Sequence, residues 1–390
     1  MTQPDLRVLV VDDTVLYRRV LSEAMAQIPG VTVVGTAAHG KIALAKLEQG
    51  PVDLVLLDVE MPVLGGLETL DAIHSMYPDT GVIMVSGANE RAADITIQAL
   101  ARGALDFVPK PEGASPEESQ SILAHQLRGV VQLFSTRKNL KQAKIMSGVL
   151  PVESKARHPG EKPASLAPKP SKKPPTRGEP SLRSAPRPAR IDVIAVGVST
   201  GGPNALVEVI PQLPPTLGVP VLVVQHMPPL FTRSLAENLA KKSQVAVREA
   251  IEGEPVQPNT VYVAPGGRHM VVRRNPSPTS AERACCIGLN DNPPENSCRP
   301  SVDVLFRSVA ANYGGNTLAV IMTGMGSDGR EGVKALKRQG CYCMTQSEDT
   351  CVVYGMPLAV DEAGLSDESV QLKELANRIA TVVRNPIPKR

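Results

Sequence analysis

The stretch Asp192–Pro203, DVIAVGVSTGGP, decides how the second half of the chain is interpreted. An apolar run ends in Gly197, Ser199 and Gly201, and a helical pattern follows, so the motif G-x-S-x-G falls at a strand-to-helix turn. Such a turn exposes a serine hydroxyl that can attack a carbonyl, and the helix N-terminus offers free N–H groups to a developing oxyanion. The alternative is a glycine-rich turn without catalytic chemistry, for example one that binds phosphate, because short motifs also occur by chance.

Apolar runs and helical patterns alternate downstream of residue 191, which predicts an α/β domain with a mostly parallel, doubly wound sheet of the Rossmann-like kind. Two further segments, Val245–Arg248 and His269–Arg273, are expected to pair as a short antiparallel element. The expected strands are Asp192–Val198, Val219–Gln225, Thr260–Ala264 and Thr317–Thr323, and the expected helices are Ala205–Leu213, Thr232–Lys242, Ser301–Asn312, Gly329–Gln339 and Val370–Arg384.

The N-terminal part shows the same alternation and predicts a second doubly wound parallel sheet, with helices on both faces. A longer helical pattern, Ser115–Lys144, follows it and leads away from the domain. The expected strands are Leu6–Val11, Val31–Ala37, Leu54–Leu57, Gly81–Ser86 and Phe107–Val108, and the expected helices are Val15–Gln27, Gly40–Gln49, Gly66–Met76 and Ala92–Arg102.

Composition separates these two parts of the chain. A length of 390 residues is enough for two domains of about 100–200 residues each. Residues 151–190 are rich in Pro, Lys, Arg and Ser and contain almost no large apolar side chains, so they cannot form a core and are expected to be a disordered linker. We therefore expect a domain over residues 1–127, a connecting helix over 128–150, the linker over 151–190 and a catalytic domain over 191–390.

Charge, termini and cysteines narrow the class of protein. The formal net charge is only +3, so we expect no nucleic-acid partner. The N-terminus lacks the apolar region of a signal peptide, and no apolar run approaches the about 20 residues of a membrane span, so we expect a cytoplasmic protein without membrane insertion. The six cysteines lack paired C-x-x-C spacing and are expected to be reduced thiols.

Polar side chains follow the strands expected in the N-terminal domain. Asp12 and Asp13 follow the first strand, Asp58 ends the third, Ser86 ends the fourth and Lys110 follows the fifth. Carboxyl ends of parallel strands share one edge of a sheet, so these side chains are expected to meet there. Close carboxylates repel, and a hard cation such as Mg²⁺ relieves that repulsion. Asp58 is then the natural acceptor of a phosphoryl group, neutralised by the metal and Lys110. A lone Asp at a strand end can instead cap a helix.

These residues resemble those of a response-regulator receiver domain, over Leu6 to about Leu127, and the resemblance implies a flavodoxin-like fold. The resemblance implies that Asp58 takes a phosphoryl group from a histidine kinase. It also implies that Asp12, Asp13 and Asp58 form the Mg²⁺ site, and that Ser86, Phe107 and Lys110 belong to the switch that reports phosphorylation.

Ser199 requires a base, and two histidines follow apolar runs in the C-terminal half. His226 directly ends a run in VLVVQHMPP and is expected to share a sheet edge with Ser199. His269 follows a Gly-Gly turn in VAPGGRHMVV and requires a loop to bring it near. The position of His226 makes it the preferred base, and His269 is the alternative.

An acid should orient the imidazole of such a pair. Asp328 lies in LAVIMTGMGSDG, after another strand and within a glycine-rich turn. The chain order Ser199, His226, Asp328 differs from the Ser–Asp–His order of α/β-hydrolases, so that fold is not expected. Asp303 falls in an expected helix, which favours a surface or first-turn position. The rival acids are Asp303, Asp291 and Asp349.

Six segments together resemble the catalytic domain of the chemotaxis protein-glutamate methylesterases: GVSTGGP, VVQHMPP, VYVAPGGRHM, RPSVDVLF, MTGMGSDG and CVVYGMP. The order of receiver, linker and this domain also matches the family. The resemblance implies that Ser199 is the nucleophile, His226 the base and Asp328 the orienting acid, with oxyanion donors among main-chain groups near Thr200 and Met325. Cys298, just before RPSVDVLF, departs from the expected pattern of that loop.

The resemblance implies a phosphorylation-activated esterase that removes methyl groups from chemoreceptor glutamates and releases methanol, with glutamine deamidation as a second activity. Methyl-accepting chemoreceptors would be its substrates, receptor arrays its location, and no cofactor would serve the esterase reaction. Three other readings are a different hydrolase with the same triad, a receiver fused to a ligand-binding or transcription module, and a non-enzymatic adaptor. The transcription module predicts a basic helix-turn-helix, which is not evident after Ile191.

Overall fold

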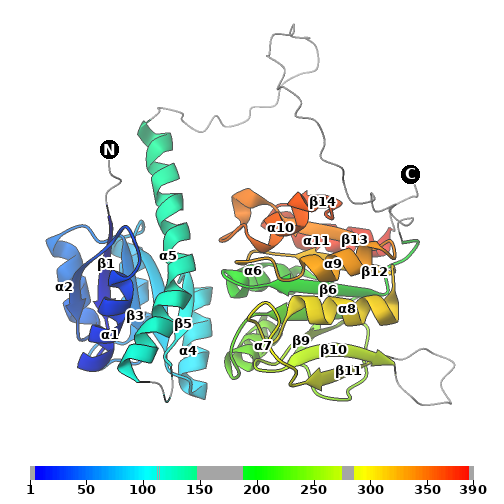
Figure 1. Cartoon of the computed structure of the whole chain (residues 1–390), viewed down its shortest axis with the longest axis horizontal. Coiled ribbons are helices and arrows are strands. Elements are labelled where there is room, and N and C mark those ends of the chain that lie inside the picture. Colours follow the sequence, from blue (N-terminus) through cyan, green and yellow to red (C-terminus); the bar gives the residue numbers. More distant parts are fainter. Residues whose placement is uncertain (1–4, 112, 114, 147–187, 275–284, 386–390) are drawn as a thin grey trace, which may run out of the picture.

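The computed structural model describes residues 5–111, 113, 115–146, 188–274 and 285–385, and these residues form two α/β domains (Figure 1). In the N-terminal domain, strands and helices alternate along the chain. Their bounds are β1 Leu6–Val11, α1 Val15–Ala26, β2 Val31–Ala37, α2 Gly40–Gln49, β3 Leu54–Asp58, α3 Gly66–Met76, β4 Gly81–Ser86, α4 Glu90–Ala101, β5 Asp106–Pro109 and α5 Pro116–Met146.

The sheet of the N-terminal domain is parallel, with the strand order β2-β1-β3-β4-β5. This is the strand order of a flavodoxin-like fold, which the resemblance to a receiver domain implies. Every residue of β3 and β4 is buried, because helices cover both faces of the sheet. The edge strand β2 alternates between half-buried and exposed residues until it ends at Ala37. The acidic residues expected at the strand ends are therefore brought to one edge.

The C-terminal domain is built around a second parallel sheet, with the strand order β14-β13-β12-β6-β7-β9-β8. Its elements are β6 Val193–Val198, α6 Gly202–Val209, the 3₁₀ helix η1 Ile210–Gln212, β7 Val221–Gln225, α7 Phe231–Lys242, β8 Ala246–Glu249, β9 Thr260–Val263, β10 His269–Arg274, β11 Cys285–Asn290, α8 Val302–Tyr313, β12 Thr317–Ile321, α9 Arg330–Lys337, β13 Tyr342–Gln346, the 3₁₀ helix η2 Glu348–Thr350, α10 Met356–Glu362, β14 Glu368–Val370 and α11 Leu372–Arg384.

The topological switch point of this sheet lies between the neighbouring strands β6 and β12, where the order of the strands along the chain reverses. From β6 the chain first adds β7 on one side and later adds β12 on the other, so a crevice is expected beyond the carboxyl ends of these strands. The turn after β6 carries Ser199, the turn after β7 carries His226, and the loop after β12 carries Asp328. The topology thus brings the three candidate residues to one edge.

The expected antiparallel pairing of Val245–Arg248 with His269–Arg273 is wrong, because each segment pairs with a different strand. β8, which covers most of Val245–Arg248, lies in the main sheet and is parallel to β9. β10 is antiparallel to β11, a strand that the sequence pattern did not reveal. Two other strands, β13 and β14, were also missed, and the helix expected from residue 370 begins at Leu372.

The helix expected over Ser115–Lys144 is observed as α5, which continues from the N-terminal domain to Met146 without a break and crosses the expected boundary at residue 127. Residues 151–187 of the expected linker lie outside the described residues. Among the described helices, none combines the length and apolar character needed to cross a bilayer.

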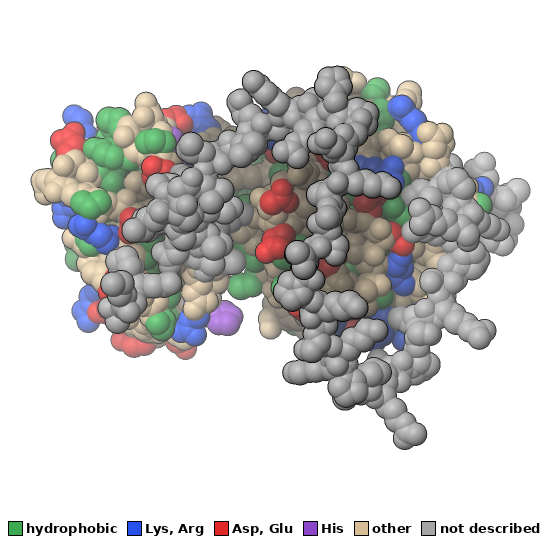
Figure 2. All heavy atoms as spheres, turned by 90° about the horizontal axis from the view of Figure 1, so that it is seen from above, with side chains coloured by type: hydrophobic (Ala, Val, Ile, Leu, Met, Phe, Trp, Pro, Cys, Tyr) green, Lys and Arg blue, Asp and Glu red, His purple; other side chains and the backbone are tan. Residues whose placement is uncertain are grey.

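Charged side chains of both signs are interspersed over the visible face in Figure 2, among the residues drawn in colour. This mixture agrees with a formal net charge of only +3. Neither the composition nor this face indicates the basic stripe of a nucleic-acid-binding protein.

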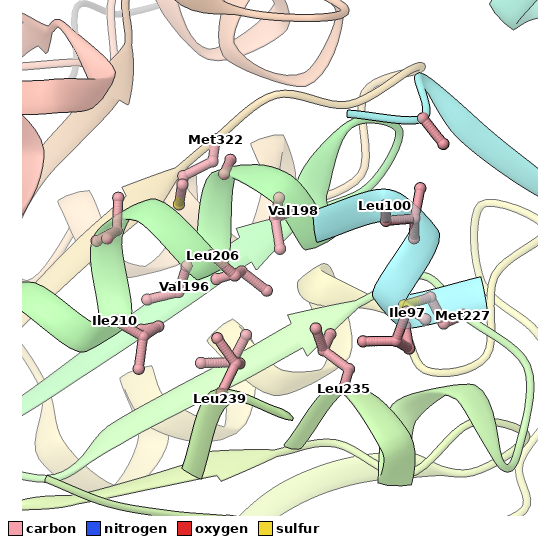
Figure 3. Packing of buried hydrophobic residues seen from close by; sticks show 14 of the residues in the cluster. Ile97, Leu100, Val196, Val198, Leu206, Ile210, Met227, Leu235, Leu239 and Met322 are labelled. Carbon is pink, nitrogen blue, oxygen red and sulfur yellow. The ribbon is translucent and has the colours of Figure 1, made fainter. Parts of the chain in front are cut away.

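Helix α4 of the N-terminal domain packs against α6 and α7 of the C-terminal domain. Ile97 and Leu100 of α4 belong to the same apolar cluster as Val198, Leu206 and Leu235 of the other domain (Figure 3). The contact continues at β5, where the rings of Phe107 and Phe231 stack with centroids 4.6 Å apart. Asn204 Nδ2 donates to the carbonyl of Ala104 at 3.1 Å. The two domains are therefore in direct contact beside the Ser199 turn.

The start of α6 depends on glycine at position 201. Gly201 has φ +73°, a left-handed conformation that a β-carbon disfavours. A Cβ at this position would also lie 2.4 Å from Cβ of Val352. Glycine therefore allows both the turn after Ser199 and the close approach of the neighbouring loop.

We predict that Gly201→Ala destabilises the C-terminal domain more than Gly218→Ala does. Gly218 has φ +86° but nothing within 4 Å of its would-be Cβ, so it reports the backbone cost alone, about 1–2 kcal/mol. The clash at Gly201 should add about 1–3 kcal/mol. Urea unfolding of both full-length variants measures the difference, and equal midpoints would contradict the steric argument.

Candidate active site

Ser199 is held by its backbone at the carboxyl end of β6. Its N–H donates to Thr323 O at 3.0 Å, and its carbonyl accepts from Gln225 Nε2 at 2.9 Å. A Cβ on Gly324 would lie 2.8 Å from Ser199 Cβ, so the turn after β12 passes directly against the serine. The backbone of Ser199 is thus held by the last residue of β7 and by the turn after β12, and the residue remains partly exposed.

His226 and Asp328 are in direct contact. His226 Nε2 and Asp328 Oδ2 are 2.8 Å apart, although the two residues are 102 positions apart in the chain. The side chains are 11% and 3% exposed, respectively. The pair is therefore shielded from solvent, where a hydrogen bond between charged partners is strong.

The Asp328 carboxylate also lies on the N-terminus of α8. It accepts from the N–H of Val302 at 2.7 Å and from the N–H of Asp303 at 3.0 Å. The Ser301 hydroxyl donates at 2.9 Å, and the N–H of Gly329 donates at 3.0 Å. These donors and the helix dipole stabilise a buried negative charge.

This environment shifts the pKa of both partners. Burial alone would lower the pKa of His226, but the hydrogen bond to Asp328 and the contact with Cys298 outweigh burial and raise it to about 9. Burial alone would raise the pKa of Asp328, but His226 and the N–H donors of α8 hold it well below its usual range. In this arrangement the pair is an imidazolium and a carboxylate at neutral pH.

The second ring nitrogen of His226 faces a cysteine. Cys298 Sγ is 3.5 Å from His226 Nδ1, and among the described residues no hydrogen bond joins Ser199 Oγ to His226. Because Nε2 is engaged by Asp328, Nδ1 is the nitrogen available to Ser199. No local sequence pattern predicts the contact between Cys298 and His226; Cys298 stands out only because it departs from the expected pattern before RPSVDVLF.

His269 has a different environment from His226. Its side chain is fully buried, its Nδ1 accepts from the N–H of Ser301 at 3.2 Å, and its Nε2 donates to Pro293 O at 3.1 Å. Both ring nitrogens are therefore used in holding the loop before α8. The structure does not bring His269 into contact with Ser199 or Asp328.

The three alternative acids, Asp291, Asp303 and Asp349, have other partners than His226. Asp291 pairs with Arg268 and is 69% exposed, and Asp349 is exposed and accepts from Gln371. Asp303 lies in the first turn of α8, which is one of the two positions expected for it, and it is buried there at 3% exposure. Its carboxylate accepts from the N–H of Gly332 at 2.6 Å, which ties α8 to α9. Burial and the charge of Asp328 raise the pKa of Asp303 to about 6.

Thr200 and Met325 flank the serine from two different turns. In the described part of the chain, the N–H groups of both residues donate to no protein acceptor. The Met325 side chain is 48% exposed, and it lies so close to α5 that a Cβ on Gly129 would be 2.3 Å from its sulfur. A helix of the N-terminal domain therefore borders the site.

The acidic residues of the N-terminal domain form a cluster. Carboxylate oxygens of Asp12, Asp13 and Asp58 lie within 4.8 Å of one another. Lys110 Nζ is 2.8 Å from Asp12 Oδ2 and 2.9 Å from Asp58 Oδ2. Burial and the charge of Asp12 raise the pKa of Asp58 to about 6, although Lys110 opposes the shift. A set of hard oxygen ligands with excess negative charge fits Mg²⁺.

Ser86 and Phe107 connect this cluster to the domain interface. The Ser86 hydroxyl is buried, and Thr96 Oγ1 of α4 lies 2.8 Å from it. Phe107 stacks on Phe231, and its neighbour Asp106 reaches the Ser199 turn, because the N–H groups of Phe107 and Gly201 donate to the Asp106 carboxylate. Burial raises the pKa of Asp106 to about 7 in spite of these donors.

Comparison with known proteins decides the family. A model of the CheB methylesterase family matches residues 194–379, and a model of the response regulator receiver domain matches residues 8–118. A protein-glutamate methylesterase/protein-glutamine glutaminase of Desulfotalea psychrophila is 41% identical over 97% of this chain and 99% of its own length. The chain belongs to the CheB family.

A protein of the same name from Symbiobacterium thermophilum is also similar, with 42% identity over 98% of both chains. Among solved structures, the catalytic domain of a Thermotoga maritima CheB methylesterase is 37% identical in sequence and corresponds to 50% of this chain and 100% of that domain, with a TM-score of 0.47. Because the receiver-domain model matches residues 8–118, the N-terminal domain is called the receiver below.

We predict that the ring of His226 titrates near pH 9 and that Asp328→Asn lowers its pKa markedly. The substitution removes the negative charge that raises the pKa, and burial, which lowers it, remains. Histidine ring NMR of the full-length protein and of the variant measures both values. An unchanged His226 titration in Asp328→Asn would contradict the assigned pairing.

Proposed function

We propose that the protein hydrolyses glutamate methyl esters on chemoreceptors, releases methanol and also deamidates receptor glutamines, in the adaptation step of chemotaxis-like signalling. The names of the full-length relatives support both activities. The observation that carries the proposal is the contact between His226 and Asp328 beside the Ser199 turn. This arrangement suits acyl transfer by a serine nucleophile.

In the proposed reaction, Ser199 Oγ attacks the γ-carbonyl carbon of the ester and transfers its proton to His226 Nδ1. Asp328 stabilises the resulting imidazolium through Nε2. The C–O bond to the methoxy group then breaks, His226 returns the proton, and methanol leaves. Water, deprotonated by the same nitrogen, hydrolyses the acyl-enzyme and restores Ser199. A glutamine side chain reacts by the same steps and releases ammonia.

The N–H groups of Thr200 and Met325 are the proposed oxyanion donors. Thr200 immediately follows the nucleophile, and Met325 follows Gly324, which touches Ser199. Two N–H groups from separate turns can converge on one oxygen atom, which is the arrangement that stabilises a tetrahedral intermediate. The proposed ester hydrolysis needs no cofactor, because the nucleophile, base and donors are all supplied by the chain.

The receiver is proposed to regulate this reaction through Asp58, with a histidine kinase as phosphodonor. Asp12, Asp13 and Asp58 would hold Mg²⁺, which supplies positive charge to the phosphoryl group when bound. Lys110 already contacts Asp58 and would pair with the same charge. Ser86, Phe107 and Lys110 would report the change to α4 and β5, which contact the catalytic domain.

The proposed partners follow from the substrate and from the receiver. Methyl-accepting chemoreceptors are the substrates, and we propose a cytoplasmic location at receptor arrays, where the methylated glutamates are found. Neither nucleic acid nor membrane insertion takes part in this proposal. The unphosphorylated receiver is proposed to inhibit the reaction, because it contacts the two turns that flank Ser199.

We predict that Ser199→Ala lowers the rate of methanol release from methylated receptor by about 10³-fold or more, because the nucleophile is lost while binding and the oxyanion donors remain. Release of ⁠methanol by the phosphodonor-treated full-length protein is the measurement. Ser369→Ala, an exposed substitution on β14, is the matched control and should keep full activity. Near-normal release from Ser199→Ala would exclude the serine mechanism.

We predict that Mg²⁺ and a small phosphodonor together raise methanol release, and that Asp58→Asn keeps the basal rate and loses this response. The amide cannot form an acyl phosphate, but it leaves the catalytic domain unaltered. Asp94→Asn, an exposed substitution on α4, should respond like the unmodified protein. A response that survives in Asp58→Asn would place the phosphoryl acceptor elsewhere.

A further inference from the structure

A tight turn over Glu295–Cys298 lies against the His226–Asp328 pair. The N–H of Cys298 donates to Glu295 O at 2.9 Å, and the N–H of Glu295 donates to Cys298 O at 3.1 Å. The two central residues, Asn296 and Ser297, have φ +53° and +61°. Two left-handed residues in a two-residue loop define a type I′ turn, for which asparagine at the first position is favoured.

The turn is fastened to α8 by an ion pair. Both guanidinium nitrogens of Arg307 contact the two carboxylate oxygens of Glu295, at 2.7 and 2.5 Å. Such a two-point contact fixes orientation as well as distance. The side chains of Asn296 and Cys298 are therefore presented to the catalytic pair from a defined position.

The Asn296 amide lies between two carboxylates. Its Nδ2 donates to Asp328 Oδ1 at 2.9 Å and to Asp303 Oδ2 at 3.0 Å. Both carboxylates are buried, at 2% and 3% exposure for Asp328 and Asp303. A single NH₂ group with two protons can satisfy one acceptor on each, whereas direct contact between the carboxylates would be repulsive.

We propose that Asn296 is a positioning residue of the esterase reaction, which holds the Asp328 carboxylate in the orientation that fixes His226. Asn296 does not touch the reacting atoms in this role. It acts on Oδ1 of Asp328 while His226 is bound to Oδ2, so the amide sets the rotation of the carboxylate about its side-chain bond. This inference rests on the proposed function, because it assumes that His226 is the base.

Loss of the Asn296 amide should change the pKa of His226 in a predictable direction. A donor stabilises the Asp328 carboxylate, and without it the carboxylate binds the imidazolium more strongly. The pKa of His226 should then rise, which moves the acid limb of the rate profile to higher pH. The other groups that act on the pair are Cys298 at His226 Nδ1, Asp303 at the start of α8, and Arg307 on the same helix.

Two substitutions at position 296 separate the amide from the turn. Asn296→Gly deletes the side chain but suits a left-handed residue, so the turn should persist. Asn296→Asp keeps the size and the left-handed tendency, but replaces the donor by a third carboxylate. Asn292→Gly, an exposed substitution in the same loop, is the matched control and should leave the kinetics unchanged.

The experiment compares kcat, KM and the pH dependence of kcat for methanol release by the phosphodonor-treated full-length variants. We expect Asn296→Gly to lower kcat by about tenfold with KM little changed, the order that one hydrogen bond to a charged group is worth. We expect the acid limb to move to higher pH, further in Asn296→Asp than in Asn296→Gly. A urea unfolding curve of each variant shows that the fold is intact.

Ser199→Ala, measured in parallel, distinguishes failure of the Asn296 inference from failure of the proposed serine mechanism. If Ser199→Ala is inactive and both Asn296 variants keep the normal kcat and acid limb, Asn296 has no positioning role and this inference is wrong. If kcat falls in the Asn296 variants without any movement of the acid limb, the residue is only structural, and the inference is equally wrong. If Ser199→Ala retains activity, the serine mechanism itself fails.

Discussion

The geometry of the site depends on the buried carboxylate of Asp328. A carboxylate this far from water is tolerated only when hydrogen-bond donors surround it. Here the donors come from separate parts of the chain: the N-terminus of α8, the Ser301 hydroxyl, the Asn296 turn and the His226 ring. The carboxylate therefore holds these segments together and also orients the imidazole. The orientation of His226 thus depends on the correct folding of these segments.

The contacts of Asp328 also determine the protonation state of His226, and with it the ability of the ring to act as a base. With a pKa of about 9, the ring is protonated at neutral pH, so Nδ1 donates toward Cys298 and cannot accept the proton of Ser199. The proposed mechanism requires the neutral ring with Nδ1 turned to the serine. In that mechanism, the carboxylate that stabilises the imidazolium during the reaction also stabilises it beforehand, so the resting arrangement disfavours attack.

The main strands, the parallel sheets and the strand-end residues could be predicted from the sequence, because buried parallel strands are continuous apolar runs and their carboxyl ends share an edge. Tyr342–Gln346 was missed because YCMTQ mixes polar and apolar residues, although all five are buried in the sheet. The burial of Asp303 could not be foreseen, since it depends on α9 packing against α8. The role of residues 295–298 depends on which loop folds over the pair, and no local pattern determines that.

Contact between the receiver and the catalytic domain connects the proposed phosphorylation site to the Ser199 turn through packed side chains. The Ser86 hydroxyl lies against Thr96, one residue from Ile97, which packs in the apolar cluster beside Val198. Phe107 stacks on Phe231, five residues after His226.

Because both domains belong to one chain, a weak interface is enough to keep them together, at an effective concentration near millimolar. A phosphoryl group on Asp58 must then change the stability of this contact by only a few kcal/mol to shift the population. Among the described residues, this contact includes the apolar cluster, the Phe107–Phe231 stack, the Asn204–Ala104 hydrogen bond and an ion pair between Arg233 and Glu90 at 3.8 Å, so a movement of α4 or β5 would alter several of its interactions at once.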